Sequence, residues 1–133
     1  MNEKDNTLLG NVLAIGARLV AEGRIPQDVL DGEPGAFALC LATREAVEVK
    51  VLHCGDEIEV GRCPQASAMH WEVDDPWMSR RHFFLAVDAK GAATLRCLGA
   101  KNGTFVNDEA VEGGAPLRRG DVIRAGSSSF LVL

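Results

Sequence analysis

Three turn segments of this 133-residue sequence carry side chains suited to holding an anion. Arg62 follows a glycine at the end of one alternating segment, Ser79 precedes another, and Asn102 begins an Asn-Gly turn. An arginine fork stays charged near neutral pH, a serine hydroxyl donates from close to the backbone, and a carboxamide both donates and accepts. These groups match a ligand that combines a phosphate, which brings roughly two negative charges and three acceptor oxygens, with an extended backbone.

The same residue types do not indicate catalysis. His53, His70 and His82 have no partner at the spacing of a catalytic triad or a metal site, so we assign no catalytic residue and no metal ligand. His82 is predicted to be a packed histidine at the start of a strand. The four cysteines lack a CxxC pair, and we expect reduced thiols that serve as small core residues. No metal or other cofactor is expected.

Composition narrows the class of protein further. Apolar residues make up 47% of the chain and charged residues 25%, which is typical of one folded globular domain. The net charge of −5 argues against general attraction to nucleic acid or to an anionic membrane. The first residues lack the positive region of a secretory signal, and the apolar run from Leu8 to Ala17 is too short to cross a bilayer. We therefore expect a cytoplasmic protein without membrane insertion.

The chain begins with a helical pattern. Apolar residues between Thr7 and Glu22 recur at helical spacing, and Gly23 stands where a helix would end. Pro26 is suited to start a further turn through Leu30. A turn cluster follows at residues 31–35, and the domain boundary is placed there.

After this boundary the hydrophobic period changes to two, as expected for strands. Val47, Val49 and Val51 alternate with Glu48 and Lys50, which predicts a strand with one wet face. The other predicted strands are Phe37 to Ala42, Glu57 to Val60, Met69 to Val73, Phe83 to Asp88, Ala93 to Leu98, Thr104 to Asn107, Val122 to Arg124 and Ser129 to Leu133. Many short strands at close spacing predict an antiparallel β-sandwich.

In this order the motifs GR, SRRH, NGTFVN and LxxGD resemble the forkhead-associated (FHA) domain, a phosphothreonine-recognition module. The resemblance covers residues 35–133 and leaves residues 1–34 as a helical N-terminal extension. It implies an all-β, eleven-stranded antiparallel sandwich of the FHA/SMAD-like type with no catalytic activity. The implied partner is a protein that carries a phosphothreonine, and the implied role is signalling or assembly.

The resemblance also implies a role for each motif residue. Arg62 and Ser79 would grip the phosphate, and Asn102 would fix the path of the ligand backbone. Arg80 lies at the rim of the site. Lys101 replaces the threonine or serine of many relatives, and it offers a point charge in place of a hydroxyl. Three further residues, namely Gly61, His82 and Gly103, are expected to support the site.

Two alternatives remain open for the function and for the N-terminal extension. The departure at Lys101 leaves room for a phosphate-independent assembly module that uses the sandwich face or the N-terminal helix, either with a partner or by self-association. Thr7 is predicted to cap the first helix, and phosphorylation of Thr7 is the alternative. Trp77 is predicted either to join the core or to contact an apolar ligand residue after the phosphothreonine.

Overall fold

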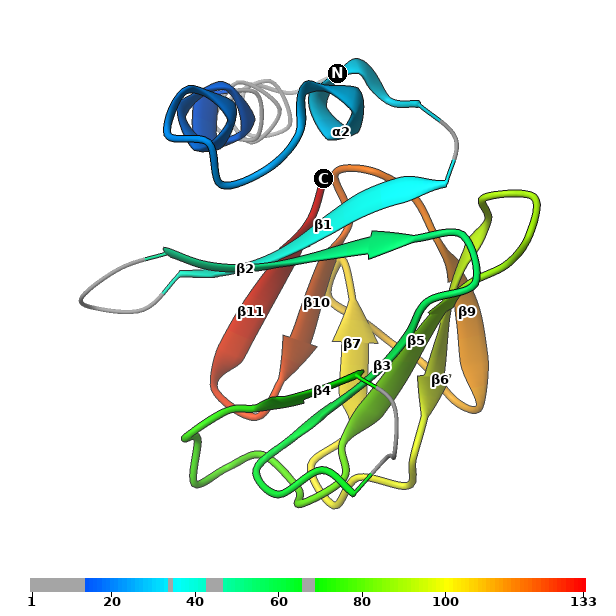
Figure 1. Cartoon of the computed structure of the whole chain (residues 1–133). Coiled ribbons are helices and arrows are strands. Elements are labelled where there is room, and N and C mark those ends of the chain that lie inside the picture. Colours follow the sequence, from blue (N-terminus) through cyan, green and yellow to red (C-terminus); the bar gives the residue numbers. More distant parts are fainter. Residues whose placement is uncertain (1–13, 34, 43–46, 66–68) are drawn as a thin grey trace.

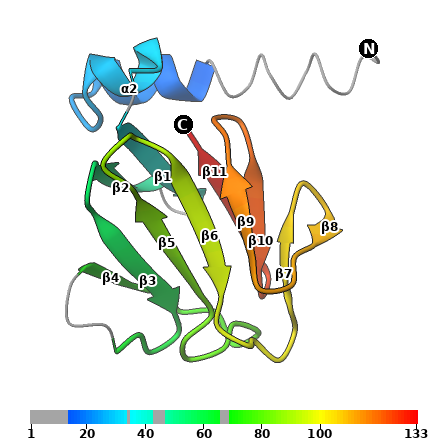
Figure 2. The same cartoon turned by 90° about the vertical axis from the view of Figure 1, so that its right-hand side faces the viewer.

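Two β-sheets packed face to face form the body of the molecule, and a short helical layer lies against one end (Figures 1 and 2). The structure is a computed structural model that describes residues 14–33, 35–42, 47–65 and 69–133. Thr7 and the first part of the predicted helix lie outside these residues. Among the described residues, no helix has the length and apolarity needed to span a bilayer.

The eleven strands divide into sheets of six and five. The six-stranded sheet has the order β2-β1-β11-β10-β7-β8, with β2 Val47–His53, β1 Ala36–Ala42, β11 Ser128–Val132, β10 Val122–Ala125, β7 Thr104–Val106 and β8 Glu109–Ala110. The five-stranded sheet has the order β4-β3-β5-β6-β9, with β4 Met69–Glu72, β3 Glu57–Gly61, β5 Phe83–Val87, β6 Ala93–Cys97 and β9 Gly114–Leu117. The predicted all-β sandwich is therefore confirmed.

One strand pair departs from the antiparallel prediction. Strands β3 and β4 run parallel, with Ile58 opposite Met69 and Gly61 opposite Glu72. Hydrophobic alternation gives the face of a residue but not the direction of its neighbouring strand, so the sequence pattern could not distinguish the two arrangements. Strands β8 and β9 were not predicted, since β8 has only two exposed residues and β9 contains Pro116.

The inner faces of the two sheets form the main core. Phe83 and Phe130 contact each other edge to face at 5.4 Å between ring centroids, and Trp71 meets Phe130 at 5.5 Å. These three rings come from β5, β11 and β4, so they join both sheets across the sandwich. Edge-to-face aromatic pairs are stabilising beyond the area that they bury.

Strand β1 lacks hydrophobic alternation because both of its faces are covered. Phe37, Leu39 and Leu41 enter the core between the sheets. The alternate residues Ala38 and Cys40 belong to a second apolar cluster on the other face. That cluster also contains Leu19, Ile25, Val29, Ala36 and Leu133, so it joins the helical layer to the sheet.

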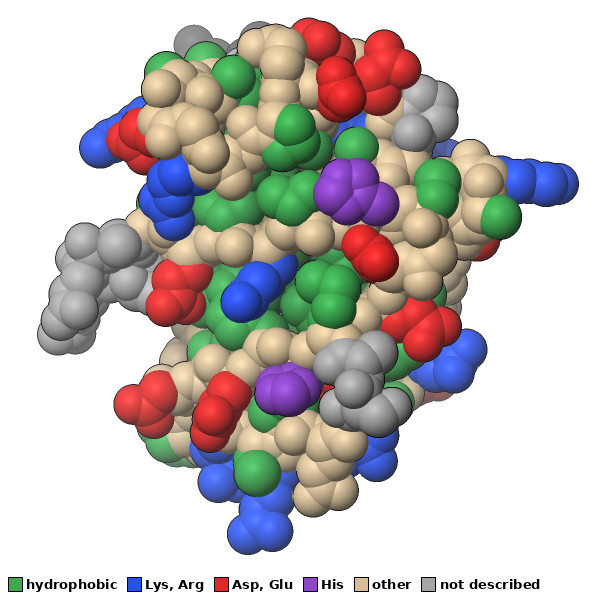
Figure 3. Space-filling model, in the orientation of Figure 1, with side chains coloured by type: hydrophobic (Ala, Val, Ile, Leu, Met, Phe, Trp, Pro, Cys, Tyr) green, Lys and Arg blue, Asp and Glu red, His purple; other side chains and the backbone are tan. Residues whose placement is uncertain are grey.

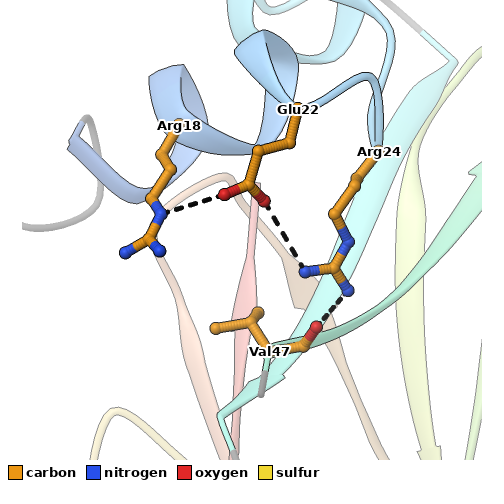
Figure 4. Close-up of polar contacts among 4 residues, drawn as sticks. All are labelled: Arg18, Glu22, Arg24 and Val47. Atoms are coloured by element: carbon orange, nitrogen blue, oxygen red, sulfur yellow. Dashed lines mark hydrogen bonds and ion pairs between the residues drawn. The ribbon is translucent and has the colours of Figure 1, made fainter.

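The helical layer follows the sequence prediction within the described residues. The first helix runs to residue 21 and is followed by a turn at Gly23, where φ is 70°. The N–H of Arg24 donates to the Leu19 carbonyl at 2.9 Å across this turn. Helix α2 follows at Gln27–Asp31, as predicted after Pro26. Figure 4 shows how the connection is held: Glu22 accepts from Arg18 at 3.1 Å and lies near Arg24, which donates to the Val47 carbonyl of β2.

The cysteines match the prediction only in part. All four are free, and Cys40 is a buried core residue whose pKa is raised to about 11, chiefly by burial and against the opposing charge of Arg24. Cys54 and Cys63 are exposed, so their assignment to the core was wrong. Both lie in the loops that join strands.

Candidate functional site

Three loops meet at the end of the sandwich opposite the helical layer (Figures 1 and 2). They follow β3, precede β5 and join β6 to β7. The Arg62 N–H donates to the Ser79 carbonyl at 3.0 Å, and the Lys101 N–H donates to the Ser79 hydroxyl at 3.1 Å. The structure therefore brings together residues that lie 17 to 39 positions apart in the sequence.

Two neighbouring carbonyls orient the long side chains of the site. Arg62 Nε donates to the Met78 carbonyl at 3.2 Å. Asn102 Nδ2 donates to the Trp77 carbonyl at 2.9 Å. The Arg62 and Asn102 side chains are exposed, and their two acceptors belong to consecutive residues of the loop before β5. This arrangement leaves the remaining guanidinium donors of Arg62 and the carboxamide oxygen of Asn102 for a ligand.

His82 is a structural residue beneath this surface, as predicted. It is fully buried, its Nδ1 atom lies 3.0 Å from the Ser79 N–H, and its Nε2 atom lies 2.8 Å from the Gly103 carbonyl oxygen. One imidazole thus links the loop before β5 with the loop between β6 and β7. Burial lowers the pKa of His82, against the opposing effects of the Gly103 carbonyl and the Asp75 charge. The ring is therefore neutral near neutral pH.

Steric constraints explain why Gly61 and Gly103 are glycines. A Cβ atom on Gly61 would lie 2.1 Å from the Arg80 carbonyl oxygen, so no larger residue fits where the first two loops cross. Gly103 has a φ of +77°, which side chains rarely adopt, and its carbonyl accepts from His82. This geometry is consistent with the prediction that the two glycines support the site.

Basic side chains surround the convergence of the loops. Arg62, Arg80 and Lys101 are all exposed there, and within the described ranges none of them forms an ion pair with a carboxylate. Figure 3 shows Lys and Arg side chains projecting from this lower end of the molecule. The local charge is therefore positive although the whole chain is acidic. Such a cluster favours a multiply charged anion.

Arg81 is also exposed, but it is paired with a carboxylate and does not join this cluster. Its Nη2 and Nε atoms donate to Glu59 Oε1 at 2.6 and 3.0 Å, and its side chain is 51% exposed. Glu59 is only 1% exposed and also accepts from the Gln65 N–H at 2.6 Å. The hydrogen bonds and charge of Glu59 raise the pKa of Arg81. The Arg81–Glu59 pair ties the loop before β5 to strand β3, and the Gln65 N–H joins the loop after β3 to the same carboxylate.

Sequence reasoning missed two carboxylates that support the site. Glu59 alternates with Ile58 and Val60, a pattern that is typical of a water-facing residue, yet the Arg81 side chain and the following loop cover it. Asp75 stands beside Asp74 and Pro76 in a polar loop sequence, yet it is 3% exposed. Neither carries a local signal, because their partners come from other parts of the chain.

The two packed sheets define the class of the protein as a β-sandwich domain with converging loops at one end. The FHA domain family model matches residues 58–126, which is just over half of the sequence. The chain belongs to the FHA domain family, as the sequence motifs predicted. A comparison with curated protein sequences finds no match.

Solved structures agree with this assignment. The FHA domain of FhaA, described in complex with the intracellular domain of Rv3910, is 32% identical with a TM-score of 0.62, and the match covers 73% of this chain and 99% of that one. The FHA domain of the CT664 protein from Chlamydia trachomatis has a TM-score of 0.67 at 24% identity, covering 74% and 96%. An FHA domain of a hypothetical protein from Arabidopsis thaliana has a TM-score of 0.63 at 28% identity, covering 74% and 85%.

Proposed function

We propose that this chain binds phosphothreonine-containing peptides or proteins through the three converging loops and catalyses no reaction. The observation that carries the proposal is the hydrogen-bonded convergence of Arg62, Ser79 and Asn102 at one end of the sandwich. A related structure, 32% identical, is described as an analysis of phosphothreonine-dependent FHA domain interactions. Membership of the same family supports an equivalent role for these loops here.

Each exposed residue has a separate task in this proposal. Arg62 supplies charged donors to the phosphate, and the Ser79 hydroxyl donates to a second phosphate oxygen while it accepts from the Lys101 amide. Lys101 and Arg80 add positive charge at the rim. Asn102 holds the ligand backbone with the part of its carboxamide that does not bind the Trp77 carbonyl.

The expected affinity is moderate. Charge-assisted hydrogen bonds contribute about 1.5–3 kcal/mol each, and ordering a flexible peptide offsets part of this gain. Three or four such bonds give a dissociation constant of about 1 μM. An affinity in this range suits reversible signalling or assembly.

In this proposal Trp77 contacts a ligand residue after the phosphothreonine. Its side chain is 65% exposed, which excludes the core alternative, and its carbonyl is fixed by Asn102. An exposed aromatic side chain on a fixed backbone offers a preformed apolar contact. We expect peptides with an apolar residue in this region to bind more tightly than peptides with an acidic one.

The phosphate-independent assembly role is less well supported. Leu19, Ile25 and Val29 of the helical layer are buried against the six-stranded sheet of the same chain, so these apolar side chains of the described part are not free for a partner. The layer also lies at the end opposite the three loops (Figure 2). Ile15 remains 37% exposed, so association through the helix is a separate question.

A single titration series tests the proposal. The full chain is titrated calorimetrically with a phosphothreonine peptide, its phosphoserine counterpart and the unphosphorylated peptide. Binding of the first and none of the last supports the proposal, and the phosphoserine peptide reports the selectivity that Lys101 allows. Equal binding of all three would reject it. Light scattering at two protein concentrations measures self-association independently.

A further inference from the structure

Asp75 is a buried carboxylate between the loop before β5 and the turn that joins β10 to β11. Its Oδ1 atom accepts from the Trp77 N–H at 2.9 Å. Its Oδ2 atom accepts from the Ser127 N–H at 2.8 Å and from the Ser128 hydroxyl at 2.7 Å. The residue is only 3% exposed, and a buried charge is costly unless hydrogen bonds compensate it.

The charge of Asp75 is stabilised by these donors. Burial alone would raise the pKa of Asp75, but the hydrogen bonds from Ser128, Trp77 and Ser127 outweigh burial and lower the pKa. Asp75 is therefore an anion at neutral pH that accepts and does not donate. An anion with three fixed donors holds its surroundings in one arrangement.

The residues held by Asp75 are those that orient the ligand-binding side chains. The Asp75 side chain holds the Trp77 N–H, and the Asp75 carbonyl accepts from the Met78 N–H at 3.1 Å. The carbonyls of the same two residues accept from Asn102 and Arg62, respectively. One acidic residue thus fixes the backbone that presents both acceptors.

The turn between β10 and β11 completes this support. Gly126 has a φ of +61°, and a Cβ atom there would lie 2.8 Å from Asp75 Oδ2 and 2.8 Å from the Met78 nitrogen. The turn can approach the loop this closely only because residue 126 is a glycine. Strands β10 and β11 therefore serve as a rigid base for the Trp77–Met78 segment.

We propose that Asp75 is a positioning residue of the phosphopeptide site, which sets the directions of Arg62 and Asn102 by holding the Trp77–Met78 backbone against the β10–β11 turn. This inference rests on the proposed function for its effect on binding. Its effect on the two side chains exists in the free protein and can be measured without a ligand.

The test compares Asp75→Asn with Asp74→Asn in the full chain. Asp74 is the exposed neighbour, so its variant matches the change in charge but leaves the loop contacts intact. In Asp75→Asn an NH2 group replaces one carboxylate oxygen. This group donates and cannot accept, so at least one of the three hydrogen bonds to residue 75 is lost. NMR of the free proteins then follows the Nε–H signal of Arg62, the side-chain amide of Asn102 and the backbone amides of Trp77 and Ser127.

We expect all four signals to shift in Asp75→Asn and to stay unchanged in Asp74→Asn. We also expect phosphothreonine peptide affinity to fall about tenfold in Asp75→Asn, the ratio that corresponds to about 1.4 kcal/mol. The titrations are made well below the melting temperature, where a residue that contributes only to stability would leave affinity and the Arg62 signal unchanged. Unchanged Arg62 and Asn102 signals, or an affinity within twofold of the parent, would overturn the inference.

Ser128→Ala provides a second variant if Asp75→Asn does not fold. It removes one donor to Asp75 Oδ2 and leaves both backbone donors in place. A smaller shift of the same signals supports the inference, and no shift contradicts it. If the parent chain binds no phosphopeptide, the proposed function fails, while the signals of the free protein still decide the positioning role of Asp75.

Discussion

The Nδ1 atom of His82 accepts a hydrogen bond from the backbone N–H of Ser79 at 3.0 Å. Because Nδ1 accepts, the ring proton of the neutral imidazole lies on Nε2, where it is donated to the Gly103 carbonyl oxygen. Protonation of Nδ1 would direct a ring N–H toward the Ser79 N–H, and the hydrogen bond between them would be lost. The neutral tautomer is therefore part of the architecture of the site.

Stability is expected to fall in mildly acidic solution because of His82. Its pKa in the folded chain lies below the ordinary value of 6.5, chiefly through burial, although the Gly103 carbonyl and the Asp75 charge oppose this. The unfolded chain thus takes up the proton first, so the stability that the neutral ring contributes is complete above pH 6.5 and is lost as pH falls from 6.5 through the folded pKa. Urea unfolding at several pH values between 8 and 5 measures this loss.

The control for this pH dependence is His70→Gln, which removes an exposed histidine and should retain the loss. Asp75 and Asp88 have pKa values lowered from 3.8, so their contributions are present above that pH and disappear only in stronger acid. The loss that depends on His82 begins near pH 6.5, above the pH at which these two carboxylates begin to contribute a loss. A free energy of unfolding that stays constant from pH 8 to 5 would contradict the role of His82.

Replacing Arg62 should remove phosphopeptide binding without unfolding the domain. We expect Arg62→Ala to weaken the free energy of phosphopeptide binding by about 2–5 kcal/mol, because the phosphate loses a charged partner. Arg62→Lys keeps the charge but not the planar fork, and we expect intermediate affinity. Calorimetric titration measures the effect, with Arg18→Ala as a control of equal charge on the distant helix, where the side chain is 81% exposed. Parent-like affinity in Arg62→Ala would remove Arg62 from the site.

Asn102 should act on the ligand backbone and not on the phosphate. We expect Asn102→Ala to weaken binding of a phosphothreonine peptide by about 1–3 kcal/mol through lost hydrogen bonds. Binding of free phosphothreonine, which has no flanking peptide, should change little. Competition titrations with both ligands measure the difference. If the variant weakens both ligands equally, Asn102 supports the phosphate pocket and does not guide the peptide.

Sequence patterns predicted those features of the molecule that depend on the local sequence. Alternation located β5, which buries Phe83, Leu85 and Val87 in the core, and β2, whose alternating valines are partly buried against the second apolar cluster. The ordered motifs predicted site residues in three loops, and these loops converge in the structure. The direction of β4 could not be predicted, since it depends on the partner strand. Glu59 and Asp75 were missed because a carboxylate becomes buried only when distant donors converge on it, and single-sequence patterns do not contain that convergence.

One side chain crosses the predicted boundary between the N-terminal extension and the sandwich. The boundary was drawn at a turn cluster, yet Arg119 from the loop before β10 reaches across it. The Arg119 guanidinium donates to the carbonyls of Val29, Glu33 and Ala36 at 3.1, 2.7 and 2.7 Å. It also lies 4.4 Å from the ring centroid of Phe37.

Arg119 should therefore stabilise the extension and the sandwich as one unit. Its donors satisfy carbonyls at the end of α2, where the helix carries partial negative charge, and burial lowers the pKa of the guanidinium without neutralising it. We expect Arg119→Ala to lower the free energy of unfolding by about 2–3 kcal/mol, through lost hydrogen bonds and a lost cation–π contact. Arg118→Ala is the matched control, since Arg118 is the exposed neighbour in the same loop. Chemical denaturation of both variants measures the effect, and equal stability of the two would show that the extension is held by apolar packing alone.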